Sequence, residues 1–390
     1  MKKLILLILI STSFFLHSFA QEEGNKTTFK FGGYIKADFL NTWYTNGDVG
    51  ERSPLRDFHL PSQIPVGPAD QNFDLDYHVK ESRFNFDVRT TLLGKEIHGF
   101  IELDFLLSGS GDEKVSNSFN PRLRHAYLEW DRLLIGQTWS TFMVVVVPDE
   151  IDFSGALDGL VFIRQPQIRY KAGSWWFALE NPETTITSYL GSAPEVTDSE
   201  VLPDLIVRKN FGGDWGTWSI AGVGRTLHKR DSAKYSTFGF GITTGGKLKV
   251  GKTDDIRIIA TYGNGLGRYL AAGFLPGAAR EMDGSLNPIS TLNGYIAYNH
   301  FWIPKLSSSF SLAAYQAFHD EAIVSQEINN SSYSVSGNLK YDPVPQLRFG
   351  VEYMYGYREL LAGTNGAFHR VQFAAKYTFG YHNAVADEKR

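Results

Sequence analysis

The sequence predicts an all-β fold: a transmembrane antiparallel β-barrel of about sixteen strands with an inward-folded third loop. Apolar and polar side chains alternate along successive segments, which is the pattern of strands with one apolar face and one hydrated face. Long polar connections alternate with brief turns, as expected for a membrane barrel with long outer loops and short periplasmic turns. The composition agrees, because 14% of the 390 residues are aromatic, 38 are glycine and the mean hydropathy is only -0.21.

The first twenty residues have the features of a secretory signal peptide. Lys2 and Lys3 precede an apolar run at residues 4–10, and small residues surround Ala20. The run is shorter than the ~20 residues that a membrane-spanning helix needs, so cleavage before Gln21 is expected. The sequence therefore divides into a signal peptide (1–20), a barrel (21–379) and a charged C-terminal tail (380–390). This arrangement predicts export through the periplasm and insertion into a bacterial outer membrane.

Charge and cysteine content exclude several classes of function. The formal net charge is -4, and removing Lys2 and Lys3 with the signal peptide leaves 36 basic against 42 acidic residues, or -6. This balance argues against a nucleic-acid partner. Without cysteine there is no disulfide or thiol nucleophile, and the ten histidines lack metal-ligand spacing. The glycine-rich stretches at 109–112 and 263–267 lack the setting of a nucleophile elbow or a dinucleotide loop. We therefore expect no catalytic residue, metal site or cofactor.

The first two strands show the alternation clearly. Along residues 28–42 one face carries Phe29, Phe31, Ile35 and Phe39, whereas the other carries lysine and aspartate. Residues 77–93 place apolar side chains opposite a charged face formed by Glu81, Arg83, Asp87 and Arg89. Four charges on one face need water or partners. Both strands are therefore expected to separate lipid from a hydrated lumen.

The remaining connections repeat the same rhythm. Long ones lie near residues 43–76, 107–121, 141–160, 182–202, 228–234, 265–290, 319–331 and 360–368. Brief ones lie near residues 94–95, 131, 172–173, 212–216, 251–255, 303–305 and 342–346. Aromatic side chains gather beside the brief turns, as a girdle at one bilayer interface requires: Trp130, Trp175, Trp176, Phe211, Trp215, Trp218, Phe301, Trp302, Tyr341, Tyr377 and Phe379.

The last expected strand, residues 370–379, ends in an aromatic residue. Val371, Phe373, Ala375, Tyr377 and Phe379 share one face. An amphipathic closing strand that ends in phenylalanine resembles the C-terminal signal recognised by the outer-membrane barrel assembly machinery. That machinery is therefore an expected partner during biogenesis, although here the tail at 380–390 follows the aromatic residue.

The third long connection is too apolar for an exposed or disordered segment. Five apolar residues at 143–147 precede a proline and several carboxylates. Inside a wide barrel, such a segment would pack across the lumen and narrow it. The predicted constriction loop includes Met143, Pro148, Asp149, Glu150, Asp152 and Asp158.

The alternation of side chains along each strand then predicts which residues line the pore. The basic candidates are Arg83, Arg89, Arg164, Arg169, Arg225 and Arg358, and Arg164 depends on whether Pro166 introduces a bulge. The acidic candidates are Glu81, Asp87, Glu102, Asp104 and Glu352. A basic wall facing an acidic loop would create a transverse field, and dominant arginines would favour anions. The alternative, that these arginines only pair with neighbouring carboxylates, stays open.

Seven separated motifs resemble the DcaP-like family of outer-membrane porins: RLRHAYLEW (122–130), GQTWSTF (136–142), RQPQIRY (164–170), LENPET (179–184), PDL (203–205), TYGNGLGRY (261–269) and GVEYMYGYRE (350–359). The resemblance covers nearly the whole chain after the signal peptide. It implies a sixteen-stranded homotrimer embedded in outer-membrane lipid, with passive uptake of small hydrophilic solutes, particularly anions such as dicarboxylates. A non-conducting surface receptor or adhesin and an outer-membrane lipid hydrolase remain as alternatives.

Overall fold

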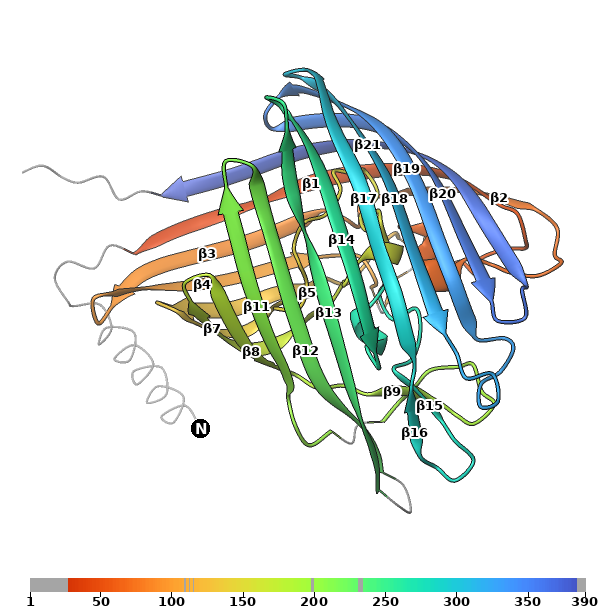
Figure 1. Ribbon diagram of the computed structural model, residues 1–390. Helices are drawn as coiled ribbons and strands as arrows, with labels where there is room; N and C mark the ends of the chain where they lie inside the picture. Colours follow the sequence, from red (N-terminus) through yellow and green to blue (C-terminus); the bar gives the residue numbers. More distant parts are fainter. Residues whose placement is uncertain are drawn as a thin grey trace, which may run out of the picture.

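The computed structural model describes residues 27–108, 110–111, 113–114, 116–197, 200–230 and 234–383. The expected signal peptide lies outside these residues, as do residues 384–390 of the expected tail. The described chain is almost entirely strand and loop (Figure 1). Among the described residues, no helix has the length and apolar character to cross a membrane.

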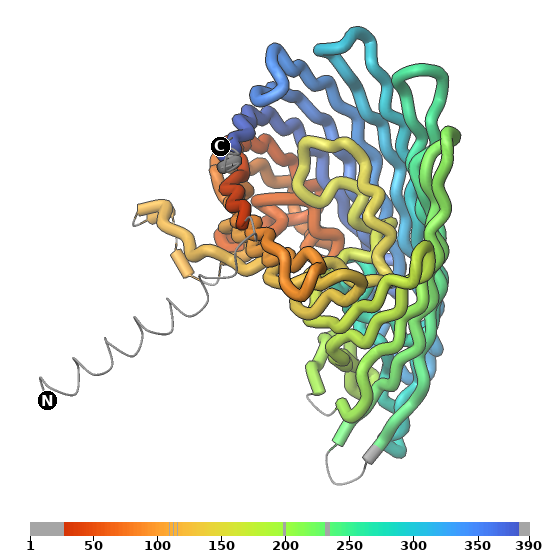
Figure 2. Tube along the Cα trace, turned by 90° about the vertical axis from the view of Figure 1, so that its left-hand side faces the viewer, coloured from red at the N-terminus to blue at the C-terminus, as the bar shows by residue number. Residues whose placement is uncertain are grey.

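One large antiparallel sheet closes on itself to form the barrel (Figures 1 and 2). Its strands are β1 (Thr28–Tyr44), β2 (Asn72–His78), β3 (Arg83–Leu92), β4 (Lys95–Asp104), β5 (Arg122–Trp130), β6 (Leu133–Trp139), β7 (Arg164–Ala172), β8 (Trp175–Glu180), β11 (Asp204–Gly213), β12 (Gly216–Arg230), β13 (Lys234–Val250), β14 (Asp254–Asn264), β17 (Ser290–Ile303), β18 (Leu306–Phe318), β19 (Asn329–Val344), β20 (Leu347–Leu360) and β21 (Asn365–Asn383). The first and last strands pair along sixteen residues, from Phe29 opposite Asn383 to Tyr44 opposite Phe368.

The seventeen strands fill sixteen strand positions around the barrel, because β2 and β3 follow each other in a single position. Both pair with β1, β3 along residues 28–34 and β2 along residues 38–44. Residues 79–82 separate β2 from β3 within this position. The predicted sixteen-stranded barrel is therefore confirmed.

Strand alternation matches the predicted faces. In β1 the side chains of Phe29, Ile35 and Phe39 are 59%, 52% and 42% exposed on the outside, whereas Lys36 and Asp38 are buried on the inside. Apolar residues facing outward match hydrocarbon, and the polar face lines the lumen. Brief turns occupy one end and long loops the other (Figure 1), with exposed Trp175 and Trp302 beside the turns.

The closing strand is longer than expected. β21 continues through Gly380 to Asn383 and remains paired with β1, so the barrel does not end at Phe379. The aromatic residue therefore lies within the last strand. The pairing continues because β1 extends back to Phe29, so residues 29–32 of β1 lie opposite residues 380–383 of β21.

Three long loops fold inward, and we name them by order along the chain: loop 1 (residues 45–71), loop 3 (140–163) and loop 6 (265–289). Loop 1 carries η1 (Pro54–Arg56) and η2 (Pro61–Gln63), loop 3 carries η3 (Leu157–Gly159), and loop 6 carries η4 (Gly267–Tyr269). Figure 2 shows loop 3, in yellow, inside the ring of strands. The predicted inward course of the third loop is thus seen directly.

The inward fold of loop 6 was not predicted. Its backbone pairs with the end of loop 3, since Phe162 N donates to Tyr269 O at 2.9 Å and Ala271 N donates to Leu160 O at 3.0 Å. Apolar side chains from both loops form one buried cluster against the wall, including Phe142, Met143, Leu266, Tyr269, Leu270 and Phe274. Loop 6 therefore supports loop 3 from behind and fills part of the lumen.

Short strands in the outer loops form a second sheet. These are β9 (Thr185–Thr187), β10 (Glu195–Val196), β15 (Ala278–Arg280) and β16 (Leu286–Pro288). The parallel pairing of β15 with β9 joins loop 6 to the connection between β8 and β11. This small sheet fixes the outer end of loop 6.

Candidate functional site

Loop 3 is seated against the wall at two glycines. A Cβ on Gly159 would lie 2.3 Å from the carbonyl oxygen of Gly294 on β17, so only glycine permits this close approach. On the next part of the wall, a Cβ on Gly350 of β20 would lie 2.3 Å from Cδ1 of Ile151. The loop therefore lies directly on the strands β17 and β20.

Polar groups on β19 and β20 hold the loop backbone. Glu352 accepts hydrogen bonds from the backbone N–H groups of Ile151 at 2.8 Å and Asp152 at 3.0 Å. Asn338 donates to the backbone oxygen of Asp149 at 3.1 Å, and Lys340 forms an ion pair with its carboxylate at 3.0 Å. Charge-assisted bonds of this kind are stronger than neutral ones. Glu352, expected as a pore-lining acid, thus anchors loop 3 to the wall.

The acidic residues of loop 3 also turn toward the wall. Glu150 accepts hydrogen bonds from Ser336 at 2.6 Å, from the N–H of Ala156 at 2.8 Å and from Ser311. Asp158 accepts from His59 and Ser334. Glu150 and Asp158 are therefore held by hydrogen bonds on the wall side, whereas Asp149, Glu150 and Asp152 also line the open space beside the loop. A buried carboxylate needs fixed donors, and the serine-rich inner faces of β18 and β19 supply them.

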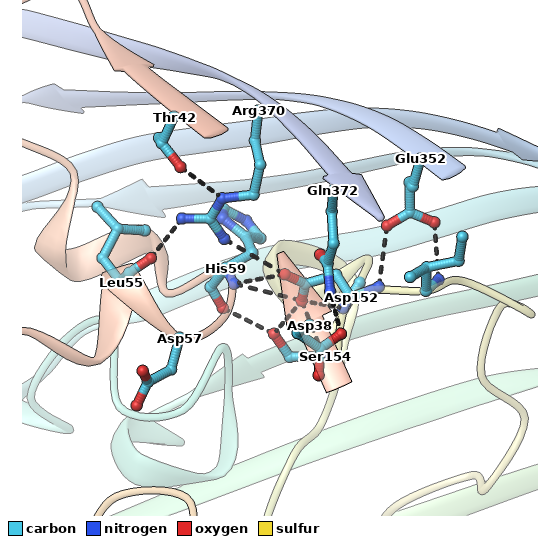
Figure 3. Close-up of polar contacts among 12 residues, drawn as sticks. Asp38, Thr42, Leu55, Asp57, His59, Asp152, Ser154, Glu352, Arg370 and Gln372 are labelled. Carbon is cyan, nitrogen blue, oxygen red and sulfur yellow. Dashed lines mark hydrogen bonds and ion pairs between the residues drawn. The ribbon is translucent and has the colours of Figure 1, made fainter. Parts of the chain in front are cut away.

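Loop 1 is fastened onto loop 3 by one buried histidine (Figure 3). His59 Nε2 lies 2.8 Å from Asp158, and its backbone N–H donates to Asp152 at 3.0 Å. Ser154 donates to the carbonyl oxygen of His59 at 2.7 Å, while Arg370 of β21 pairs with Asp152 at 3.4 Å. Loop 3 is thus held both by the wall and by loop 1. The sequence carries no indication of His59. The alternation of residues 370–379 puts Arg370 on the inner face, but it does not reveal the contact of Arg370 with loop 3.

An open space of about 250 Å³ lies between loop 3 and the opposite wall. The wall side is formed by β1, β3, β5, β20 and β21, and the loop side by residues 147–155. The charged residues that line it are Lys36, Glu81, Arg83, Arg124, Asp149, Glu150, Asp152, Arg348 and Lys376. We call this space the passage.

Four arginines gather around two carboxylates beside the passage. Arg122 and Arg124 lie 2.8 and 2.7 Å from Asp104, and Arg124 lies 2.8 Å from Glu102. Arg83 is 3.6 Å from Glu102. Arg164 completes this arginine cluster and forms no ion pair with any described residue. Four positive and two negative charges leave an excess of two positive charges.

A β-bulge explains why the sequence missed two members of the cluster. In the pairing of β4 with β5, Glu102 faces His125 and Leu103 faces Leu123, so Arg124 is an extra residue. The bulge directs both Arg124 and His125 inward, and both are buried. Strict alternation from His125 would have placed both Arg122 and Arg124 on the lipid face. No local sequence signal marks this bulge.

Aromatic rings at the end of β6 and in loop 3 face the arginine cluster. The Arg164 guanidinium lies 4.5 Å from the ring centre of Trp139, and Arg124 lies 5.3 Å from that of Phe153. Farther along the wall, Lys376 lies 4.1 Å from the ring of Tyr34 and forms no ion pair with a described residue. Ring faces stabilise cations without neutralising them. These contacts hold the guanidinium of Arg164 and the ammonium group of Lys376 in place without an ion pair.

The other predicted basic residues have structural partners. Arg169 donates to Thr141 at 2.7 Å, Arg225 to the carbonyl oxygen of Leu266 at 3.0 Å, and Arg358 to that of Ile64 at 2.8 Å. Each thus clamps one inward loop to the wall. Arg89 pairs with Asp87 at 3.0 Å and Glu96 at 2.9 Å near a brief turn. Of the six predicted arginines, the structure brings Arg83 and Arg164 together in the arginine cluster, and of these two Arg83 lines the passage.

The predicted acidic residues divide in the same way. Glu81 lines the passage, where Tyr34 donates to it at 3.0 Å and Lys36 also contacts it. Glu102 and Asp104 belong to the arginine cluster. Within the described ranges, no group of three or more histidine and acidic side chains is arranged to hold a metal ion.

The model of the DcaP outer membrane protein family matches residues 62–379, which is most of the chain. The chain belongs to the DcaP outer membrane protein family. With its closed barrel, this DcaP-family member is a porin-like integral protein of the outer membrane. The resemblance inferred from the seven motifs is confirmed.

Solved structures support the same fold. The crystal structure of the outer membrane channel DcaP of Acinetobacter baumannii superposes with a TM-score of 0.74 at 24% identity, covering 92% of this chain and 99% of that chain. Outer-membrane expressed OmpT of Vibrio cholerae gives 0.51 at 10% identity, and its trimer form gives 0.50 at 11%. Those alignments cover 92% of this chain and 99% and 100% of the OmpT chains. No curated protein matches the sequence significantly.

Proposed function

We propose that this DcaP-family protein is a passive diffusion channel for small hydrophilic solutes, that it favours anions, and that loop 3 sets its narrowest point. The observation that carries the proposal is the arginine cluster. It holds two excess positive charges beside a loop whose own carboxylates are engaged by the wall.

The charged residues that line the passage also favour anions. Five basic residues line it against four acidic ones, so the balance is 5 − 4 = +1 when all are ionised. Guanidinium groups suit carboxylates because they offer paired donors in a planar fork. Small dicarboxylates are therefore the solute class that we expect the passage to favour.

The assembly and its partners are also part of the proposal. A trimer form is known for the OmpT of Vibrio cholerae, whose barrel is similar, and the resemblance of the motifs implies the same for this chain. We propose a homotrimer in outer-membrane lipid, inserted by the barrel assembly machinery. Single-channel recording on the reconstituted protein separates this proposal from the receptor and hydrolase alternatives. Discrete conductance steps support a channel, whereas a silent bilayer supports a receptor or an enzyme.

Glu150 gives the channel a pH dependence. Burial and the neighbouring Glu352 raise the pKa of Glu150 to about 8, from an ordinary value of 4.5. The side chain is therefore neutral at pH 7 and gains a negative charge as the pH rises through about 8. We expect the anion preference of wild type to fall between pH 7 and pH 9, measured as the shift in reversal potential under a salt gradient.

The matched control for this titration is Glu150→Gln, which keeps the shape of the neutral acid. This variant should hold a constant reversal potential over the same interval. Between pH 4.5 and pH 8 the folded state binds more protons at Glu150 than the unfolded state does, so wild type should also lose stability as the pH rises. An equal pH response in both proteins would assign the titration to other groups.

A further inference from the structure

A groove of about 730 Å³ lies on the outer surface of the barrel, across β17, β18, β19 and β20. These strands run side by side in Figure 1. Its rim is formed by outward-facing Tyr298, Phe310 and Tyr353, which are exposed. The groove therefore opens toward the hydrocarbon of the membrane and is separate from the passage.

A local splay of two strands builds the groove. The ladder between β18 and β19 contains the pairs Ser307 with Lys340 and Phe310 with Gly337, and no register pair lies between them. Here the N–H of Ser309 donates to the side chain of Asn338 at 2.8 Å instead of to a backbone carbonyl. A Cβ on Gly337 would meet only a ring atom of Phe310, at 3.9 Å. The depression thus arises from an interrupted ladder and a missing side chain.

The two ends of the groove differ in polarity. Toward the brief turn after Ile303 lie Trp302, whose Nε1 donates to Ser308 at 3.0 Å, and His300, whose Nδ1 is 2.7 Å from Asp254. On the other side of the groove, along β18, β19 and β20, the lining consists of Phe310, Leu339, Val351 and Tyr353 around Gly337. Tryptophan and histidine suit the level of lipid head groups, and the apolar part suits an acyl chain.

We propose that this groove binds one glycerophospholipid from the leaflet that faces the brief turns. One acyl chain lies over Gly337 between Phe310 and Tyr353. The phosphate lies near His300, whose second ring nitrogen is available because the first contacts Asp254. Lys305, exposed in the adjacent turn, adds a positive group. A depression that is polar at one end and apolar at the other fits a single amphiphile better than the wall of another barrel.

The test compares wild type with Gly337→Trp, which fills the floor of the groove. Gly222→Trp is the matched control, because Gly222 also lies mid-strand on the outer face and a Cβ there meets only Gly241 O, at 3.9 Å. The three proteins are washed in detergent, given phosphatidylglycerol or phosphatidylethanolamine, and examined by native mass spectrometry. Each methylene group lost from contact changes affinity about fourfold. We expect at least about a fourfold loss of bound phospholipid in Gly337→Trp alone.

Folding is checked by heat-dependent gel mobility and by unchanged channel conductance. A second variant, His300→Gln with Lys305→Gln, should weaken phospholipid binding and leave the affinity for a long-chain alcohol unchanged. Equal retention in Gly337→Trp and Gly222→Trp would overturn the proposal. So would dissociation of the oligomer by Gly337→Trp alone, because that result would make the groove a contact between subunits.

Discussion

Replacing residues 143–154 with a short glycine-serine linker is expected to raise the single-channel conductance at least about twofold, because the narrowest section limits ion flow. These residues supply much of the loop side of the passage, from Val147 to Ser154. Their removal leaves the arginine cluster on the wall but takes away the loop surface opposite it. The measurement is conductance of the reconstituted variant in a planar bilayer.

Loop 6 provides the control for this replacement. It packs behind loop 3 rather than against the passage, so shortening its tip at residues 281–284 should leave conductance unchanged. A variant whose conductance equals that of wild type would show that loop 3 does not set the narrowest point. Heat-dependent gel mobility checks that both variants form folded barrels.

Neutralising two arginines of the cluster is expected to remove most of the anion preference. In the double variant Arg83→Gln with Arg164→Gln the cluster falls from two excess positive charges to none. These two arginines are chosen because Arg164 has no ion pair and Arg83 has only the 3.6 Å contact with Glu102. Each charge attracts an anion and repels a cation by about 0.5 kcal/mol at about 8 Å in water. Losing two charges therefore changes the energy difference between the two ions by about 2 kcal/mol and should lower the anion-to-cation permeability ratio about thirtyfold.

The matched control removes the same net charge elsewhere. Arg89→Gln with Arg132→Gln changes two arginines near the brief turns, outside the residues that line the passage. This control should keep the reversal potential of wild type. If both double variants shift it equally, selectivity depends on overall charge and not on the arginine cluster.

The sequence predicted the barrel well because its dominant constraint is local. A strand that separates lipid from water must alternate, so Phe29, Ile35 and Phe39 could be placed outside and Lys36 inside without knowledge of any neighbour. The third loop was also predictable, since five apolar residues cannot remain in solvent. Both features depend on short stretches of chain.

The interior was harder to predict because it depends on contacts between distant segments. Strand parity cannot reveal that Arg225 would clamp loop 6, or that Glu352 would accept hydrogen bonds from residues about 200 positions away. The bulge at Arg124 reverses parity without a sequence signal. The inward course of loop 3 could therefore be predicted from the sequence, whereas the contacts of the arginines with aromatic rings required the structure.

We propose that a positively charged passage between loop 3 and the arginine cluster selects solutes. The most direct test of this proposal is the reversal potential of the wild-type protein in a planar bilayer under a potassium chloride gradient at pH 7. A potential displaced toward the chloride equilibrium value is predicted. A potential displaced toward the potassium value would contradict the claim.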